Sequence, residues 1–171
     1  MAREQKYRRR SARVLLIDGR DRLLLLKKLP HERFLEEGIT WWTPGGGVER
    51  NETLRQAAAR ELHEEVGLKI DEAQLGNLVA HRSGYTKLPW ASGMFRDDFF
   101  HLRVDTHEVD TSRQQDYERK MDAGHHWWSI PELAATTETI FPAGLVPLLT
   151  DLIADRIPAE PVTLPWNPPS G

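Results

Sequence analysis

The chain has 171 residues and a formal net charge of -3, and it is long enough for one domain with a sizeable hydrophobic core. The absence of cysteine excludes disulfides and thiolate-bound zinc, and no apolar run approaches the length of a membrane span. The nearly balanced charge and the lack of a signal-peptide core lead us to expect a cytoplasmic protein with neither membrane nor nucleic acid as a partner.

Residues 1–10 form a basic N-terminal tail that leads into the first predicted strand. Its basic residues are Arg3, Lys6, Arg8, Arg9 and Arg10, and Arg13 follows shortly after the tail. Such a cluster is typical of a solvated tail, and the alternative is an arm that attracts phosphate near an active site. The apolar runs Ser11–Ile17 and Leu23–Leu26 flank a turn that contains Asp-Gly, so the sequence predicts a β-hairpin.

A glycine-rich segment and a long helix follow. After a polar loop over Pro30–Gly38, the segment Trp41–Val48 predicts a strand that enters three glycines, whose backbone can approach a ligand closely. The helix is predicted from about Asn51, a suitable N-cap, to Val66, and Gly67 suits a left-handed C-cap. The buried stripe expected on this helix consists of Leu54, Ala57, Ala58, Leu62 and Val66.

The second half of the chain predicts strands and helices in alternation. The expected strands are Leu75–His81, Met94–Val104 and His125–Ile130, with a turn-rich loop, Ser83–Gly93, between the first two. We expect a short helix or an ordered loop over Arg113–Met121, a short helix opened by Pro131 and a last helix over Gly144–Asp155. This order predicts an α/β fold with a mixed sheet in one domain, residues 1–157, and a proline-rich tail, residues 158–171, that is extended or disordered.

Three carboxylates crowd one face of the predicted long helix. Glu61, Glu64 and Glu65 stand at relative positions 0, +3 and +4, where like charges repel by roughly a few tenths of a kcal/mol per pair. A multivalent cation would turn this repulsion into a binding site. The alternative is an ordinary solvated acidic helix face, while an EF-hand is excluded because the chain lacks an Asp-x-Asp-x-Asp-Gly loop.

The segment Gly46–Leu68 resembles the Nudix box of the Nudix hydrolase family. Nine positions match without insertion or deletion: Gly46, Glu52, Arg60, Glu61, Leu62, Glu64, Glu65, Gly67 and Leu68. The resemblance implies an α/β/α sandwich with a mixed sheet. It also implies a metal-dependent pyrophosphohydrolase that uses Mg²⁺ or Mn²⁺ and cleaves a nucleoside diphosphate linked to another moiety. The alternatives are a nucleotide-sensing module that binds without turnover and an isomerase on the same scaffold.

The resemblance also implies roles for individual residues. By position, Glu61, Glu64 and Glu65 are expected to bind metal, with the backbone carbonyl of Gly46 as a further ligand. Arg60 matches the family arginine and is expected to orient a nearby glutamate, for which its i,i+4 relation to Glu64 is suitable. Glu52, the first glutamate of the box, is expected to have a structural role at the start of the helix.

The general base is expected either inside the box, as Glu64, or in a loop outside it. The leading candidate outside the box is Glu118, and Asp98 and Asp122 compete with it. For all three, a solvated acid at the surface is the alternative.

Substrate specificity is expected to lie in the loops 30–38, 83–93 and 106–124. Four aromatic side chains are candidates for stacking on a base: Phe34, Trp42, Tyr85 and Trp90. Tyr85 lies 17 residues past Leu68, at a position associated with dinucleoside polyphosphate hydrolases of the family. The other tryptophans considered, Trp41, Trp127 and Trp128, are expected in the core, and the histidines are expected to be structural or at the surface. The proline-rich tail and the apolar hairpin could serve a homodimer.

Overall fold

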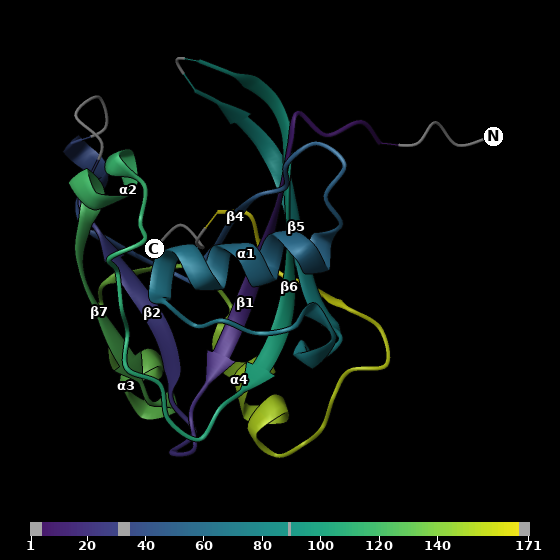
Figure 1. Cartoon of the computed structure of the whole chain (residues 1–171), viewed down its shortest axis with the longest axis vertical. Coiled ribbons are helices and arrows are strands. Elements are labelled where there is room, and N and C mark those ends of the chain that lie inside the picture. Colours follow the sequence, from purple (N-terminus) through teal and green to yellow (C-terminus); the bar gives the residue numbers. More distant parts are fainter. Residues whose placement is uncertain (1–4, 31–34, 89, 168–171) are drawn as a thin grey trace.

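The computed structural model describes residues 5–30, 35–88 and 90–167 (Figure 1). The strands are β1 (Arg9–Ile17), β2 (Leu23–Lys28), β3 (Thr40–Trp42), β4 (Gly45–Gly47), β5 (Leu78–Lys87), β6 (Ser92–Arg103), β7 (Asp122–Trp128), β8 (Thr139–Phe141) and β9 (Val162–Thr163). The α-helices are α1 (Leu54–Val66), α2 (Asp116–Met121), α3 (Ile130–Ala135) and α4 (Leu145–Ile153). No helix of the described ranges is long and apolar enough to cross a membrane.

The strands form one mixed sheet in the order β8-β3-β2-β1-β6-β5-β9. The pairs β1–β6, β3–β8 and β5–β9 are parallel, whereas β1–β2, β2–β3 and β5–β6 are antiparallel. Two strands lie off this path, since β4 pairs with β1 and β7 pairs with β2. The predicted hairpin is therefore confirmed as β1–β2. The central strands β1 and β2 each pair with several other strands.

Two apolar cores lie on opposite faces of the sheet. Alternate residues of β1 point to opposite faces, so that Val14 and Leu16 pack under α1 while Leu15 and Ile17 pack against α4. On α1, the fully buried side chains Ala57, Ala58, Leu62 and Val66 form the predicted stripe. Figure 1 shows α1 crossing the sheet over β1 and β6. Helices on both faces confirm the expected α/β/α sandwich.

Helix α1 begins later than its sequence predicts. Thr53 is the N-cap, and its side chain accepts a hydrogen bond from the backbone N–H of Gln56 in a capping box. Asn51 instead has a φ of 64° in the turn before the helix, a conformation that asparagine tolerates. The C-terminal prediction is confirmed, because Gly67 ends the helix in the left-handed region with φ 73°.

Two segments predicted as loops are largely strand. Strand β5 continues to Lys87 and β6 begins at Ser92, so the expected loop 83–93 is mostly the outer part of a long hairpin. The glycines Gly45–Gly47 form β4, which pairs with Ser11–Arg13 of β1. Glycine allows this close pairing, because a Cβ on Gly45 would overlap the backbone of β1.

The proline-rich C-terminal segment is extended where the structure describes it, and it packs on the domain. Val162 and Thr163 pair in parallel with Ala80 and His81 of β5, and Leu164 is buried in the core beside α4. The N-terminal segment likewise joins the sheet, since β1 starts at Arg9 and Arg10 pairs with the buried Asp98 at 2.8 Å. Residues at both ends of the described chain therefore belong to the folded domain.

The β1–β2 turn depends on Asp18, which organises four donors. Its carboxylate accepts the backbone N–H groups of Arg20 and Arg22 and the Arg22 guanidinium. Burial alone would raise the pKa of Asp18, but the hydrogen bonds from Arg22 and Arg20 outweigh it and hold the pKa below the usual value of 3.8. The charged form is therefore the one that stabilises the turn.

Asp18→Asn is expected to lower the free energy of unfolding at pH 7 by about 1–3 kcal/mol, because it removes charge-assisted hydrogen bonds to a buried group. A lowered pKa contributes stability above the unfolded-state pKa and loses it as the pH falls through the folded-state pKa. The difference between wild type and variant should consequently shrink below about pH 4. Urea denaturation at pH 7 and pH 3 measures both values, and a difference that is independent of pH would contradict this role for the Asp18 charge.

Candidate active site

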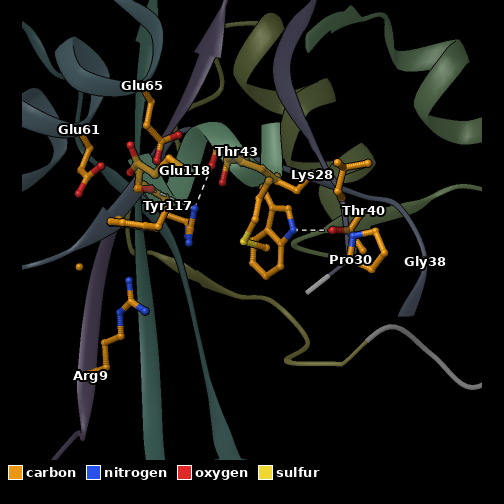
Figure 2. Close-up of a pocket in the computed structure, with 17 residues that line it drawn as sticks. Arg9, Lys28, Pro30, Gly38, Thr40, Thr43, Glu61, Glu65, Tyr117 and Glu118 are labelled. Atoms are coloured by element: carbon orange, nitrogen blue, oxygen red, sulfur yellow. Dashed lines mark hydrogen bonds between the residues drawn. The ribbon is translucent and has the colours of Figure 1, made fainter. Parts of the chain in front are cut away.

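Three buried carboxylates meet where α1 faces α2. Glu61 and Glu65 project from successive turns of α1, and Glu118 projects from α2, with ligand oxygens within 4.8 Å of one another. The exposed fractions of the three residues are 6%, 6% and 9%. Figure 2 shows these side chains gathered at one end of a cavity of about 260 Å³. The structure thus brings together two acids of the box and the leading candidate outside it.

The cluster is electrostatically unfavourable by itself. Burial is the main reason that the pKa of Glu65 is raised to about 8; the neighbouring Glu61 and Glu118 carboxylates also raise it, whereas Lys28 and Arg13 lower it. Burial also raises the pKa of Glu61, although Arg60 opposes the shift. The Oε2 atom of Glu61 is buried and has no hydrogen-bond partner among the described residues. An unpartnered carboxylate oxygen among hard oxygen donors fits a divalent cation such as Mg²⁺ or Mn²⁺.

Arg60 ties the start of α1 to this cluster. Its Nε and Nη2 atoms donate to both oxygens of Glu52 at 2.7 and 3.0 Å, and Nη2 also donates to the carbonyl of Gly47. Its Nη1 atom donates to Glu61 at 3.0 Å and to Glu64 at 3.3 Å. The hydrogen bonds from Arg60 hold the pKa of Glu52 below its usual value. Arg60 therefore orients Glu61 directly, and Glu52 serves to hold Arg60.

Glu64 lies apart from the three clustered acids. Its side chain is 26% exposed and is held by Arg60, and it is not one of the residues whose oxygens lie within 4.8 Å of one another. The helical spacing explains this arrangement, because Glu64 is rotated away from the line that joins Glu61 to Glu65 one turn later. Its expected role as metal ligand or base stays a prediction, and its geometry places it at the edge of the cluster.

The expected contribution of Gly46 also stays a prediction, and the structure places Gly46 against the cluster. A Cβ added at Gly46 would overlap the carboxylate of Glu61, so only glycine lets β4 approach α1 this closely. Gly46 lines the same cavity as Glu61, Glu65 and Glu118.

Positive side chains line the other walls of the cavity. Arg9, Arg13 and Lys28 come from β1 and β2, and Figure 2 shows the Arg9 guanidinium pointing toward the carboxylates. Arg13 donates from Nη1 to the carbonyl of Thr43 at 2.9 Å, while its buried Nε atom has no hydrogen-bond partner among the described residues. The sequence does not predict Lys28 at this site. It suggests Arg9 only through the alternative of an N-terminal arm that attracts phosphate. Their sequence signal is weak, because a basic residue at the end of a strand is usually solvated.

The candidate aromatic residues separate into three groups. Trp42 lines the carboxylate cavity and, with Tyr85, a second cavity beside it. Trp90 is 64% exposed and is not among the residues that line either cavity. Phe34 lies outside the described residues. The expected core positions are confirmed for Trp41 and Trp128, which pack edge to face at 5.1 Å.

The competing bases lie elsewhere. Asp98 is buried in β6 and forms ion pairs with Arg10 and Arg96. Its carboxylate therefore already has partners within the sheet. Asp122 follows α2 at its C-cap and accepts the backbone N–H of Gly124. Of the candidates outside the box, only Glu118 joins the described carboxylate cluster.

The sequence from residue 7 to residue 149 matches the family model of the NUDIX domain. Because this match covers most of the chain, the protein belongs to the Nudix family. The alignment includes both the carboxylates of α1 and Glu118 of α2, and it ends before β9.

Individual relatives match shorter segments. An 8-oxo-dGTP diphosphatase of Proteus vulgaris is 49% identical over 44 residues, which cover 26% of this chain and 39% of that protein. An RNA pyrophosphohydrolase of Aliivibrio fischeri (strain MJ11) is 27% identical over 114 residues, which cover 60% of this chain and 66% of that protein. The chain thus spans well under half the length of the first of these relatives.

The fold is similar to that of a MutT protein from Methanosarcina mazei Go1, with a TM-score of 0.62 at 19% identity, covering 90% of this chain and 98% of that one. The dihydroneopterin triphosphate pyrophosphohydrolase of E. coli gives a TM-score of 0.59 at 19% identity, covering 88% and 99%. At such identities the likeness concerns the fold alone.

Proposed function

We propose that the protein is a metal-dependent pyrophosphohydrolase that cleaves a diphosphate linkage in a nucleoside diphosphate joined to another moiety. The observation that carries this proposal is the buried Glu61, Glu65 and Glu118 cluster, which faces Arg9, Arg13 and Lys28 across one cavity. Acids that would repel one another suit a cation, and the opposing bases suit phosphate oxygens. Carboxylates and bases that line one cavity are consistent with a bound metal and a ligand that carries phosphate.

The side chains divide the chemistry among them. Glu61 and Glu65 would hold Mg²⁺ or Mn²⁺ with Glu118 beside them, and Arg60 keeps Glu61 in position. The metal would offset the charge of the diphosphate and lower the pKa of the attacking water. Arg9, Arg13 and Lys28 would bind the phosphate oxygens and stabilise charge as the bridging P–O bond breaks.

Water attacks phosphorus, the bridging oxygen leaves with the second phosphate, and a carboxylate takes the proton of the water. We assign this proton to Glu118, because it lies in the cluster and is contributed by α2, outside the box that supplies Glu61 and Glu65. The alternative base is Glu64 of the box, which lies at the edge of the cluster and is held by Arg60.

The alternative function is a nucleotide-sensing module without turnover. The complete set of acids favours the enzyme, because binding alone does not require three buried carboxylates. The relatives suggest two substrate classes for testing, an oxidised purine nucleoside triphosphate and RNA with a 5′-polyphosphate end.

The test is a hydrolysis panel with the purified full chain in Mg²⁺ and in Mn²⁺. It contains 8-oxo-dGTP, 5′-triphosphorylated RNA, ADP-ribose, dinucleoside polyphosphates and nucleotide sugars. We expect turnover of at least one compound, and EDTA should abolish it. Metal-independent turnover would contradict the mechanism, and tight nucleotide binding without hydrolysis of any member would favour the sensing module.

A further inference from the structure

A second cavity of about 640 Å³ adjoins the carboxylate cavity. It lies on the sheet face that packs elsewhere against α4, because Arg9, Ser11 and Arg13 alternate along β1 in phase with the core residues Leu15 and Ile17. Beyond the end of the helices, this face of the sheet borders open space. The volume falls within the range of about 300–1,000 Å³ that is typical of small-molecule sites.

The two cavities share part of their walls. Arg9, Arg13, Thr40 and Trp42 line both of them. The second cavity is therefore the space next to a ligand whose phosphates lie near Glu61 and Glu65. On the proposed function, the part of the substrate next to the phosphates is the nucleoside.

Arg82 is the central side chain of the second cavity. It is 3% exposed and donates from Nε to the buried Asp97 at 2.8 Å. Its guanidinium carbon lies 4.7 Å from the ring centroid of Trp166, 5.6 Å from that of Phe141 and 5.7 Å from that of Trp42. A second donor, Nη1, reaches the carbonyl of Trp166 at 3.3 Å. Arg82 lines the cavity, and its remaining N–H groups have no acceptor among the described residues.

Trp166 is held in place by its contact with strand β5. It packs on the backbone of Gly84 in β5, so closely that a Cβ on Gly84 would overlap the indole ring. The register of β9 on β5 brings residue 166 to this point, and Trp166 and Asn167 line the cavity. The family match ends at residue 149, so this wall lies outside the residues that the family model matches.

We propose that Trp166 and Asn167 of the C-terminal segment form a specificity-determining wall of the substrate site, in which Trp166 holds Arg82 so that Trp166 and Arg82 both contact the nucleobase. This inference rests on the proposed function, because the phosphates of the substrate fix where its base lies. A flat aromatic ring with acceptor atoms on its edge matches a wall of aromatic faces and free guanidinium N–H groups. Trp166 is thus a positioning residue for Arg82 and a contact of its own.

The test separates binding of the base from binding of the diphosphate. The ligands are α,β-methylene-ADP and α,β-methylene-GDP, which resist hydrolysis at that linkage, and methylenediphosphonate, which has neither base nor ribose. Calorimetry in Mg²⁺ gives the Kd of each ligand for the full chain. The variants are Trp166→Ala, Trp166→Phe and Gly84→Ala, and the control on the same segment is Val162→Thr, whose side chain does not line the cavity.

Trp166→Ala and Gly84→Ala should each weaken the methylene nucleotides about tenfold or more, since stacking on an aromatic side chain contributes that much per base. Both should leave methylenediphosphonate within about twofold of wild type. Trp166→Phe should restore most nucleotide affinity, and Val162→Thr should change nothing. If Trp166→Ala does not fold, Gly84→Ala performs the same displacement of the ring from the other side.

Unchanged nucleotide affinity in Trp166→Ala and Gly84→Ala would overturn the inference, and so would an equal loss for methylenediphosphonate, which would indicate a purely structural wall. These results are independent of turnover. If Trp166→Ala weakens nucleotide binding as expected but the wild type hydrolyses no member of the panel, the proposed function alone is contradicted. If the wild type hydrolyses nucleotides but Trp166→Ala leaves nucleotide affinity unchanged, this inference alone is contradicted. A wild type that binds no nucleotide would contradict both.

Discussion

Glu65→Gln should lower turnover by about 10³-fold or more while leaving the metal-free protein folded and nearly as stable as wild type. The reason is that burial raises the pKa of Glu65 to about 8, so near pH 7 the metal-free side chain is mostly protonated. Glutamine has the shape and charge of that protonated form. It cannot supply the negative charge that a cation would require, so the variant should lose metal binding without losing the fold.

The measurements are kcat on the best substrate of the panel and thermal unfolding with EDTA or with Mg²⁺. Wild type should gain stability with Mg²⁺, because a ligand that binds only the folded state raises the free energy of unfolding, and Glu65→Gln should gain little. The exposed Glu108 offers a control, since Glu108→Gln leaves the cluster intact. A Glu65→Gln variant as active as wild type would contradict the site.

The same assay distinguishes the two candidate bases. Glu118→Gln should lower kcat by about 10²-fold or more if Glu118 takes the proton of the water. Glu64→Gln should have a smaller effect, because the structure places Glu64 at the edge of the cluster. A larger loss for Glu64→Gln than for Glu118→Gln would reverse the assignment.

Arg60→Ala should lower both the stability of the fold and the activity. The substitution leaves Glu52, Glu61 and Glu64 without their shared cation and leaves the carbonyl of Gly47 without its donor. Removing one partner from a largely buried ion network costs about 2–4 kcal/mol, after allowing for the 22% exposure of Arg60. Activity should also fall by about 10²-fold, because Glu61 loses its orientation.

Arg55 offers a matched control on the same helix. It joins α1 to the loop at Glu72, Leu75 and Gly76 through carbonyl acceptors, and it contacts no carboxylate of the cluster. Arg55→Ala should therefore lower the melting temperature and leave kcat near the wild-type value. Arg60→Lys should be intermediate, because lysine keeps the charge but cannot bond both oxygens of Glu52. Equal losses of activity in Arg55→Ala and Arg60→Ala would show that the effect of Arg60 is only one of stability.

Much of the fold could be predicted because its signals are local. The β1–β2 hairpin, the stripe of α1, the left-handed Gly67 and the final helix all follow from periodicity and turn residues within short windows. The start of α1 could not be placed correctly, since Asn51 and Thr53 are both good caps and the turn around Glu52 and Arg60 decides between them. The outer hairpin was mistaken for a loop because Gly84 and Gly93 suggested turns.

The homodimer, the cytoplasmic location and the domain boundary at residue 157 stay predictions from the sequence. For the last of these, the packing of β9 and Trp166 on β5 shows that the segment beyond the boundary contributes contacts to the folded domain.

By itself, the sequence determined the family and the acidic face of the box, because the nine matched positions lie within one short segment and helical spacing puts Glu61 and Glu65 on one face. Only the tertiary structure decided which acids lie together. Glu118 joins the cluster from α2 and Glu64 remains outside it, since contacts between distant segments depend on how the helices pack. The same holds for Arg9, Lys28 and Trp166, whose positions follow from strand register and have no local signal in the sequence.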